Sequence, residues 1–189
     1  MLAGVTMKMT MQDETMTPDK LPRVTYSNIA EDFSGVHAHL DRVIPQVKAG
    51  MLGRERANWI AGRDDMSGEA FTAVSPIDRD IALGTFRAAS QEAVDRAVTA
   101  ARGACKAWRH LGWEKRAALC HRVADVMTAR RFEMAVACLI EVGKSRMEAL
   151  GEVEEAIDLV RFYADELIAN QGFGRDLKRA NPREETRDV

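Results

Sequence analysis

The most suggestive chemistry in the sequence lies in residues 138–153, where Gly143-Lys144-Ser145 matches the end of a phosphate-binding loop. Such a loop has the spacing G-x-x-x-x-G-K-[ST] and joins a strand to a helix, so that backbone N–H groups converge on the phosphate. The first glycine of the motif would stand at position 138, which is a cysteine in a segment of helical periodicity. We therefore interpret Gly143 as the left-handed C-cap of one helix and Ser145 as the N-cap of the next, with Lys144 near the negative end of the first helix dipole.

Five carboxylates follow this junction: Glu148, Glu152, Glu154, Glu155 and Asp158. They could form an acid/base pair or a metal site, because Glu148 and Glu152 share a helical face. The five also lie opposite the apolar stripe of the same segment, at spacings that suit ion pairs with Lys144 and Arg161. We expect a solvated, charged helix face.

Nucleophilic chemistry would have to come from one of three cysteines, Cys105, Cys120 and Cys138. A reactive thiol needs a lowered pKa and a nearby base, and His121 points about 100° away from Cys120 around a helix. Each cysteine falls on an expected apolar stripe, so we predict core packing for all three. His37 and His39 are two residues apart and cannot share one helical face to bind a metal. The residues therefore predict no catalytic, cofactor-binding or metal-binding site.

The composition is typical of one globular domain. The chain has 189 residues, of which 46% are hydrophobic and 30% charged, enough to build a core. A formal net charge of −2 with both signs dispersed leaves no basic stripe, which argues against nucleic acid and anionic membranes as partners. No apolar run reaches membrane-spanning length, the start lacks a secretory pattern, and the cysteines have no CxxC spacing. We expect a cytoplasmic protein.

The first half of the chain should combine one helix with a small β element. Apolar residues at spacings of three and four predict a helix over residues 33–47, which Pro45 must end or kink. Residues 57–62 and 69–75 read as two strands of a hairpin around a polar turn, and residues 80–89 read as a third strand.

The second half reads as helices. Ser90 is an N-cap, and the apolar stripe of the helix after it consists of Val94, Val98, Ala101, Cys105 and Trp108. Further helical stripes cover residues 116–127, 132–139 and 147–167, and Gly172 provides a helix stop. We divide the chain into a disordered leader (1–20), a structured part (21–172) and a loop or truncated strand (173–189).

The order of these elements resembles the N-terminal portion of the NAD(P)-dependent aldehyde dehydrogenase superfamily. The features that carry the resemblance are the strand at 58–62, Ser75-Pro76 before a strand with Gly84, the helix from Val94 to Trp108, Arg116, Glu141-x-Gly143-Lys144, Glu152, Tyr163 and Ala164. The stretches TYSNIAEDF, LDRVIPQV and LGRERANWIAG are similar to the lead-in of the subgroup that oxidises 1-pyrroline-5-carboxylate, or glutamate γ-semialdehyde, to glutamate in proline catabolism. The fold expected is an incomplete α/β aldehyde-dehydrogenase-like fold whose present segment is mostly helical.

The resemblance implies an oxidoreductase that uses NAD or NADP, acts on an aldehyde and forms homo-oligomers. Its cysteine nucleophile, glutamate base and cofactor turn belong to motifs that this chain does not reach, so no catalytic or cofactor residue is carried over. We expect the isolated chain to bind no cofactor and to be inactive. Two alternatives stay open. One is a non-catalytic module that binds another subunit through exposed apolar helix faces, and the other is nucleotide binding through Lys144.

Overall fold

The computed structural model describes residues 20–176 and 187–188, and its helices outweigh its short strands, as expected. All of the expected leader except Lys20 lies outside these residues, as do residues 177–186 and 189. The helices are α1 (Ser34–Met51), α2 (Gln91–His110), α3 (Trp113–Ala129), α4 (Arg131–Val142) and α5 (Arg146–Ala169), followed by the 3-10 turn η2 (Gln171–Phe173). None of the helices in the described ranges is both long and apolar enough to cross a bilayer.

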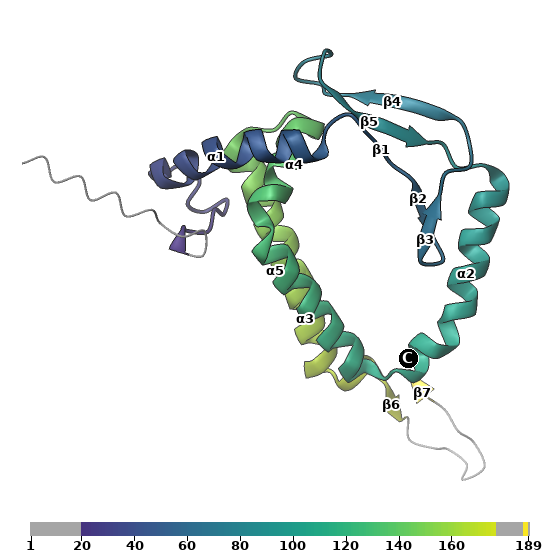
Figure 1. The fold of residues 1–189 in the computed structure, drawn as a ribbon. Helices are drawn as coiled ribbons and strands as arrows, with labels where there is room; N and C mark the ends of the chain where they lie inside the picture. The colour runs from purple at the N-terminus through teal and green to yellow at the C-terminus, as the bar shows by residue number, and fades with distance from the viewer. Residues whose placement is uncertain (1–19, 177–186, 189) are drawn as a thin grey trace, which may run out of the picture.

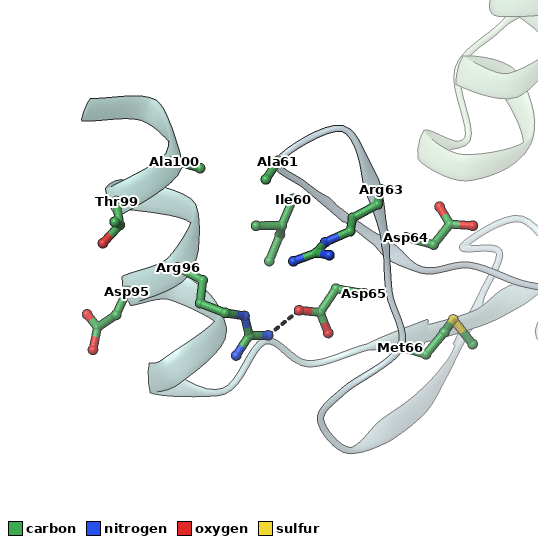
Figure 2. A pocket seen from close by; sticks show the side chains of 10 residues that line it. All are labelled: Ile60, Ala61, Arg63, Asp64, Asp65, Met66, Asp95, Arg96, Thr99 and Ala100. Atoms are coloured by element: carbon green, nitrogen blue, oxygen red, sulfur yellow. Dashed lines mark hydrogen bonds and ion pairs between the residues drawn. The ribbon is translucent and has the colours of Figure 1, made fainter. Parts of the chain in front are cut away.

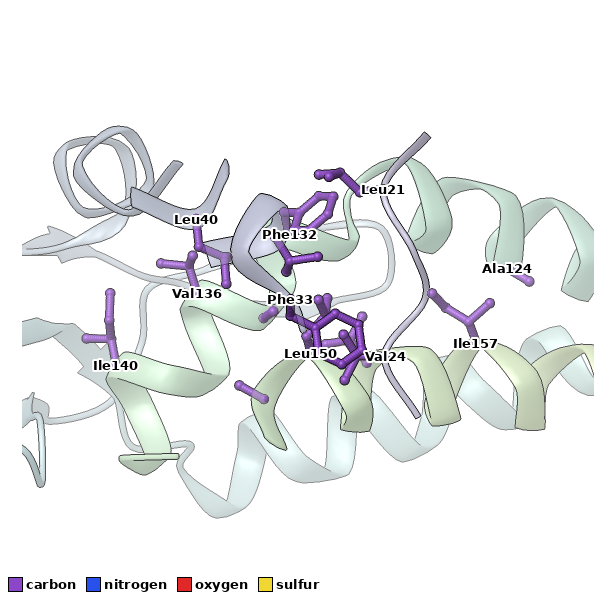
Figure 3. Packing of buried hydrophobic residues seen from close by; sticks show 14 residues of the cluster. Leu21, Val24, Phe33, Leu40, Ala124, Phe132, Val136, Ile140, Leu150 and Ile157 are labelled. Atoms are coloured by element: carbon purple, nitrogen blue, oxygen red, sulfur yellow. The ribbon is translucent and has the colours of Figure 1, made fainter. Parts of the chain in front are cut away.

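The core lies where α3, α4 and α5 pack together and α1 crosses α4 (Figure 1). The segment before α1 contributes as well, because Leu21, Val24 and Phe33 are buried against α5 residues such as Leu150 and Ile157 (Figure 3). We refer to residues 20–33 as the N-terminal strap. Burial of large apolar side chains from four separate segments is the main force that holds this part together.

Of the two effects expected of Pro45 on helix α1, a helix end or a kink, the helix end does not occur. The helix continues to Met51 although proline removes one backbone hydrogen bond and crowds the preceding turn. Val43, Ile44 and Val47 on both sides of the proline pack against the core cluster. This packing offsets the local cost of the proline, which sequence periodicity alone could not show.

Three strands form a small mixed sheet in the order β1-β5-β4. The strands are β1 (Arg54–Glu55), β4 (Ala70–Val74) and β5 (Ala82–Arg87); β1 is parallel to β5, and β4 is antiparallel to it. Gly84 has to be small here, because a Cβ at that position would lie 2.6 Å from the carbonyl oxygen of Arg54. Strand β5 confirms the strand that was expected within residues 80–89.

The hairpin is placed differently from the expectation. Strand β2 (Asn58–Ile60) pairs with β3 (Arg63–Asp65), so part of the polar stretch assigned to the turn is itself a strand. Ala61 and Gly62 between them have φ values of +53° and +79°. Two positive φ values in a two-residue connection fit a type I′ turn, which closes tightly enough to pair adjacent residues. The prediction that residues 57–62 pair with 69–75 was therefore wrong.

Helix α2 begins as predicted but its apolar stripe is not covered. The Ser90 hydroxyl accepts a hydrogen bond from the Ala93 N–H at 3.2 Å, which confirms the N-cap. Val94, Val98 and Trp108 are 45%, 47% and 47% exposed, and α2 adjoins the β2–β3 hairpin rather than the helical core (Figure 1). Among the described residues, nothing buries this face of α2.

The chain ends in two short strands, β6 (Arg175–Asp176) and β7 (Arg187–Asp188), which pair antiparallel. The expected helix stop before them lies at the right place, because α5 ends at Ala169 and Gly172 has φ +79°.

Candidate functional site

The Gly143-Lys144-Ser145 stretch is a helix junction. Gly143 has φ +80° and ψ 27°, the left-handed conformation, and its N–H donates to the Leu139 carbonyl at 3.0 Å. Ser145 begins α5 with a capping box: its hydroxyl accepts from the Glu148 N–H at 3.4 Å, and its own N–H donates to Glu148 Oε2 at 3.1 Å. A hydrogen bond from the Ser145 side chain to the Glu148 carboxylate, and then the one from the Ser145 N–H, lower the pKa of Glu148. Because a helix rather than a strand precedes Gly143, the interpretation as two caps is confirmed and the phosphate-loop geometry is not present.

Removing the Ser145 cap should measurably lower the stability of the chain. We expect Ser145→Ala to lower the free energy of unfolding by about 1 kcal/mol, because the N–H of Glu148 loses its acceptor at the start of α5. Ser145→Asp keeps an acceptor at the same place and should retain most of the stability. Urea denaturation of both variants and the parent chain measures the difference, and equal losses for alanine and aspartate would contradict the role of the cap.

Lys144 is held by a side chain rather than left free for a phosphate. It forms an ion pair with Glu152, two turns along α5, which raises the pKa of Lys144. The same carboxylate lies 3.9 Å from the Cys138 thiol. Burial, followed by the negative charge of Glu152, raises the pKa of Cys138. A thiol that stays protonated is a poor nucleophile, so this trio stabilises the α4–α5 junction and does not activate Cys138.

The other cysteines do not form a nucleophilic centre either. Cys120 is half-buried on α3, and its neighbour His121 is paired through Nε2 with Asp165 Oδ1 at 3.1 Å on α5. Cys105 is exposed on α2. The prediction that Cys105 packs in a core is wrong for the described structure, because the stripe to which it belongs has no cover there.

The histidines of α1 do not form a metal pair. The ring of His39 packs edge-on against Phe132, with 4.4 Å between ring centroids. Burial lowers the pKa of His39, and the positive charges of Arg42 and Arg131 lower it further. Across residues 20–176, no group of three or more histidine, cysteine or carboxylate side chains is arranged to hold a metal ion.

One member of the expected solvated face is buried. Glu154 is only 3% exposed, and its Oε2 lies 2.8 Å from Arg23 Nε of the N-terminal strap. Its Oε1 lies 3.5 Å from Arg131 Nε at the start of α4. Glu148, Glu155 and Asp158 are exposed as predicted. Glu154 differs because the strap and α4 both pack against this side of α5. Contacts between distant segments leave no periodic pattern in the sequence of α5, so the burial of Glu154 could not be predicted from that pattern.

A cavity of about 770 Å³ lies between the β2–β3 hairpin and α2 (Figure 2). Arg96 reaches from α2 to the carboxylate of Asp65, and Asp64 and Asp95 also line the cavity. Hydrogen bonds from the Ser67 hydroxyl and N–H, and then from Arg96, lower the pKa of Asp65 to about 2. Three carboxylates in the wall suit a dinucleotide pyrophosphate poorly, since such sites use backbone N–H groups of a glycine-rich turn. The lining of this cavity therefore does not suit a nicotinamide cofactor.

Sequence reasoning missed the ion pairs that join distant segments. Arg23 and Glu154 are 131 positions apart, and Arg96 and Asp65 are 31 apart. The spacing rules for helix faces reach only three or four residues, so they could not have found either pair.

Comparison with known proteins gives a consistent result. The family model described as aldehyde dehydrogenase family matches residues 61–186. The chain is 30% identical to 1-pyrroline-5-carboxylate dehydrogenase 2 of Halalkalibacterium halodurans over 89% of its own length and 31% of that protein. It is 35% identical to α-ketoglutaric semialdehyde dehydrogenase of Bacillus subtilis over 61% of its length and 24% of that protein.

Solved structures agree with the sequence matches. The 1-pyrroline-5-carboxylate dehydrogenase from Thermus with bound NAD superposes with a TM-score of 0.72 at 25% identity, over 85% of this chain and 30% of that one. Proline utilization A from Bdellovibrio bacteriovorus gives a TM-score of 0.68 at 32% identity, over 75% of this chain and 14% of that one. The chain thus spans less than a third of each of these relatives. Since the family model covers most of the sequence and the fold agrees, the chain belongs to the aldehyde dehydrogenase family.

Proposed function

We propose that the chain supplies the N-terminal part of an NAD(P)-dependent dehydrogenase that oxidises 1-pyrroline-5-carboxylate, in its open form glutamate γ-semialdehyde, to glutamate. The observation that carries the proposal is the similarity to 1-pyrroline-5-carboxylate dehydrogenases, which extends over 89% of the chain in sequence and 85% in structure. In this proposal residues 21–172 are a scaffold within the dehydrogenase domain, in a cytoplasmic homo-oligomer.

The chain's own residues support a structural rather than a catalytic part. The Cys138 thiol is held protonated by burial and by Glu152, and no described residue stands near it as a free base. His121 is engaged with Asp165. Aldehyde oxidation in this family needs a thiolate nucleophile and a glutamate base, which the proposal places in a part of the enzyme other than these 189 residues. No catalytic, cofactor-binding or metal-binding residue is assigned to the chain.

The activity test compares the chain with its native assembly. We expect the purified 189-residue chain to reduce neither NAD nor NADP with 1-pyrroline-5-carboxylate, because it lacks a reactive thiol. Protein isolated under native conditions from its source cells should reduce the nucleotide with this substrate faster than with α-ketoglutaric semialdehyde. Formation of reduced nucleotide at 340 nm is the readout. Turnover by the isolated chain would contradict its scaffold role, and a preference for the other aldehyde would contradict the substrate.

A second candidate function is a non-catalytic module that binds another subunit. The uncovered stripe on α2, which includes Val98 and Trp108, favours it because exposed apolar surfaces of this kind mark interaction sites. A monodisperse oligomer with a sharp thermal transition would support a self-sufficient module. Strong binding of a hydrophobic dye with a broad transition would support the scaffold that needs the rest of a dehydrogenase domain.

A further inference from the structure

A second, smaller cavity of about 190 Å³ lies between the N-terminal strap, the end of α3, the start of α4 and the middle of α5. Its wall consists of Leu21, Arg23, Thr128, Arg131, Glu154, Ile157 and Arg161. We call it the arginine cavity. It is separate from the helix junction at Gly143 and from the cavity beside α2, and it combines three guanidinium groups with one buried carboxylate.

The buried carboxylate has one oxygen that lacks a hydrogen bond. Glu154 Oε2 accepts from Arg23 Nε at 2.8 Å. Its Oε1 is buried, and no described residue donates a hydrogen bond to it; the 3.5 Å separation from Arg131 Nε is an ion pair beyond normal hydrogen-bond length. Buried acceptors are rarely left in this state. A guest that donates a hydrogen bond to Oε1 would complete the site.

The guanidinium groups of Arg23 and Arg161 can exchange partners. Arg23 Nη2 lies 2.8 Å from Asp158 Oδ2, and Arg161 Nη2 lies 2.9 Å from Asp125 Oδ1. Both aspartates are exposed, and ion pairs with exposed partners contribute little. A carboxylate that enters the cavity can therefore accept hydrogen bonds from the same two arginines without a large loss. The Thr128 hydroxyl, 3.2 Å from Arg161 Nη2, fixes one of them at the wall.

The wall carries charges of both signs, which favours a guest that also carries both. A plain anion would meet the buried carboxylate of Glu154, and a plain cation would meet the guanidinium groups of Arg23 and Arg161. A guest with both charges satisfies both sides at once. At roughly 30 Å³ for each water, the volume holds about six non-hydrogen atoms, which is the size of a small amino acid.

We propose that the arginine cavity binds a small α-amino acid as its zwitterion, with the ammonium group donating to Glu154 Oε1 and the carboxylate accepting from Arg161 and Arg23. Leu21 and Ile157 provide an apolar wall for a short side chain. The proposal does not depend on the dehydrogenase function, because none of these residues takes part in the chemistry proposed above.

Binding can be measured on the 189-residue chain with L-alanine as the probe. Isothermal titration calorimetry should show saturable binding of L-alanine, and acetate and ethylamine, each carrying one of the two charges, should bind at least about tenfold more weakly. Binding of acetate as tight as that of L-alanine, or no saturable binding of L-alanine, would overturn the proposal.

Two arginines of the same helix provide the matched test. Arg161→Met should weaken L-alanine binding about tenfold, as expected for the loss of one charge-assisted hydrogen bond. Arg146→Met is the control, because Arg146 also lies on α5 and pairs with an exposed aspartate, Asp41, but does not line the cavity. Equal affinities for the two variants would place the binding site elsewhere. Both arginines are partly exposed, so we expect both variants to fold. The test therefore leaves the buried Glu154 unchanged.

Discussion

Leu150→Ala is expected to lower the free energy of unfolding by about 2–5 kcal/mol, the range for a large apolar side chain deleted from a packed core. Leu150 is 0% exposed on the face of α5 that meets the N-terminal strap, next to Val24 and Phe33 (Figure 3). The substitution removes apolar burial and opens a cavity that the surrounding helices can fill only in part. Urea denaturation followed by circular dichroism at 222 nm measures the loss.

The matched control is Leu159→Ala on the same helix. Leu159 is 47% exposed, so the same deletion of atoms should cost less than about 1 kcal/mol. Helix propensity changes equally in the two variants, and only burial differs. A loss at Leu159 as large as that at Leu150 would contradict the claim that burial in the core distinguishes the two positions.

Gly68→Ala should have the second large effect, with an expected loss of roughly 2–5 kcal/mol from two causes. Gly68 has φ +97°, a conformation that costs an L-residue about 1–2 kcal/mol. A Cβ there would also lie 1.9 Å from the carbonyl oxygen of Ala88, so the chain before β4 would have to move away from the end of β5. Overpacking of this kind adds about 1–3 kcal/mol.

Gly62→Ala separates the two causes. Gly62 has φ +79° but nothing lies within 4 Å of an added Cβ, so this variant carries the backbone strain alone. We expect its loss of stability to be about 1–2 kcal/mol, clearly smaller than that of Gly68→Ala. Thermal and urea unfolding of the pair provide the comparison. Equal losses would show that the close approach of Gly68 to Ala88 does not restrict the sheet.

Local features were predictable because they depend on neighbouring residues. The caps at Ser90, Gly143 and Ser145 follow from side-chain acceptors and from the freedom of glycine at positive φ, and all three were found from sequence. The helical stretches followed from apolar spacing for the same reason. The family resemblance rested on the order of such elements, and it too was confirmed.

Features set by distant segments were not predictable. The β2–β3 pairing depends on the Ala61-Gly62 turn, which competes with a plausible longer connection to β4. The burial of Glu154 depends on the strap crossing α5, and the continuation of α1 past Pro45 depends on packing against α4. The stripe on α2 was correctly recognised as apolar, but periodicity indicates which face is apolar and not whether anything covers it.

The central claim is that this chain works as one part of a larger aldehyde dehydrogenase. Native mass spectrometry of the protein purified from its source cells, with peptide mapping of the same sample, tests it most directly. We predict that the residues described here occur together with further aldehyde dehydrogenase sequence, either in the same polypeptide or in a tightly bound one, including a cysteine-bearing loop. A native species that contains only these 189 residues, alone or as copies of itself, would contradict the claim.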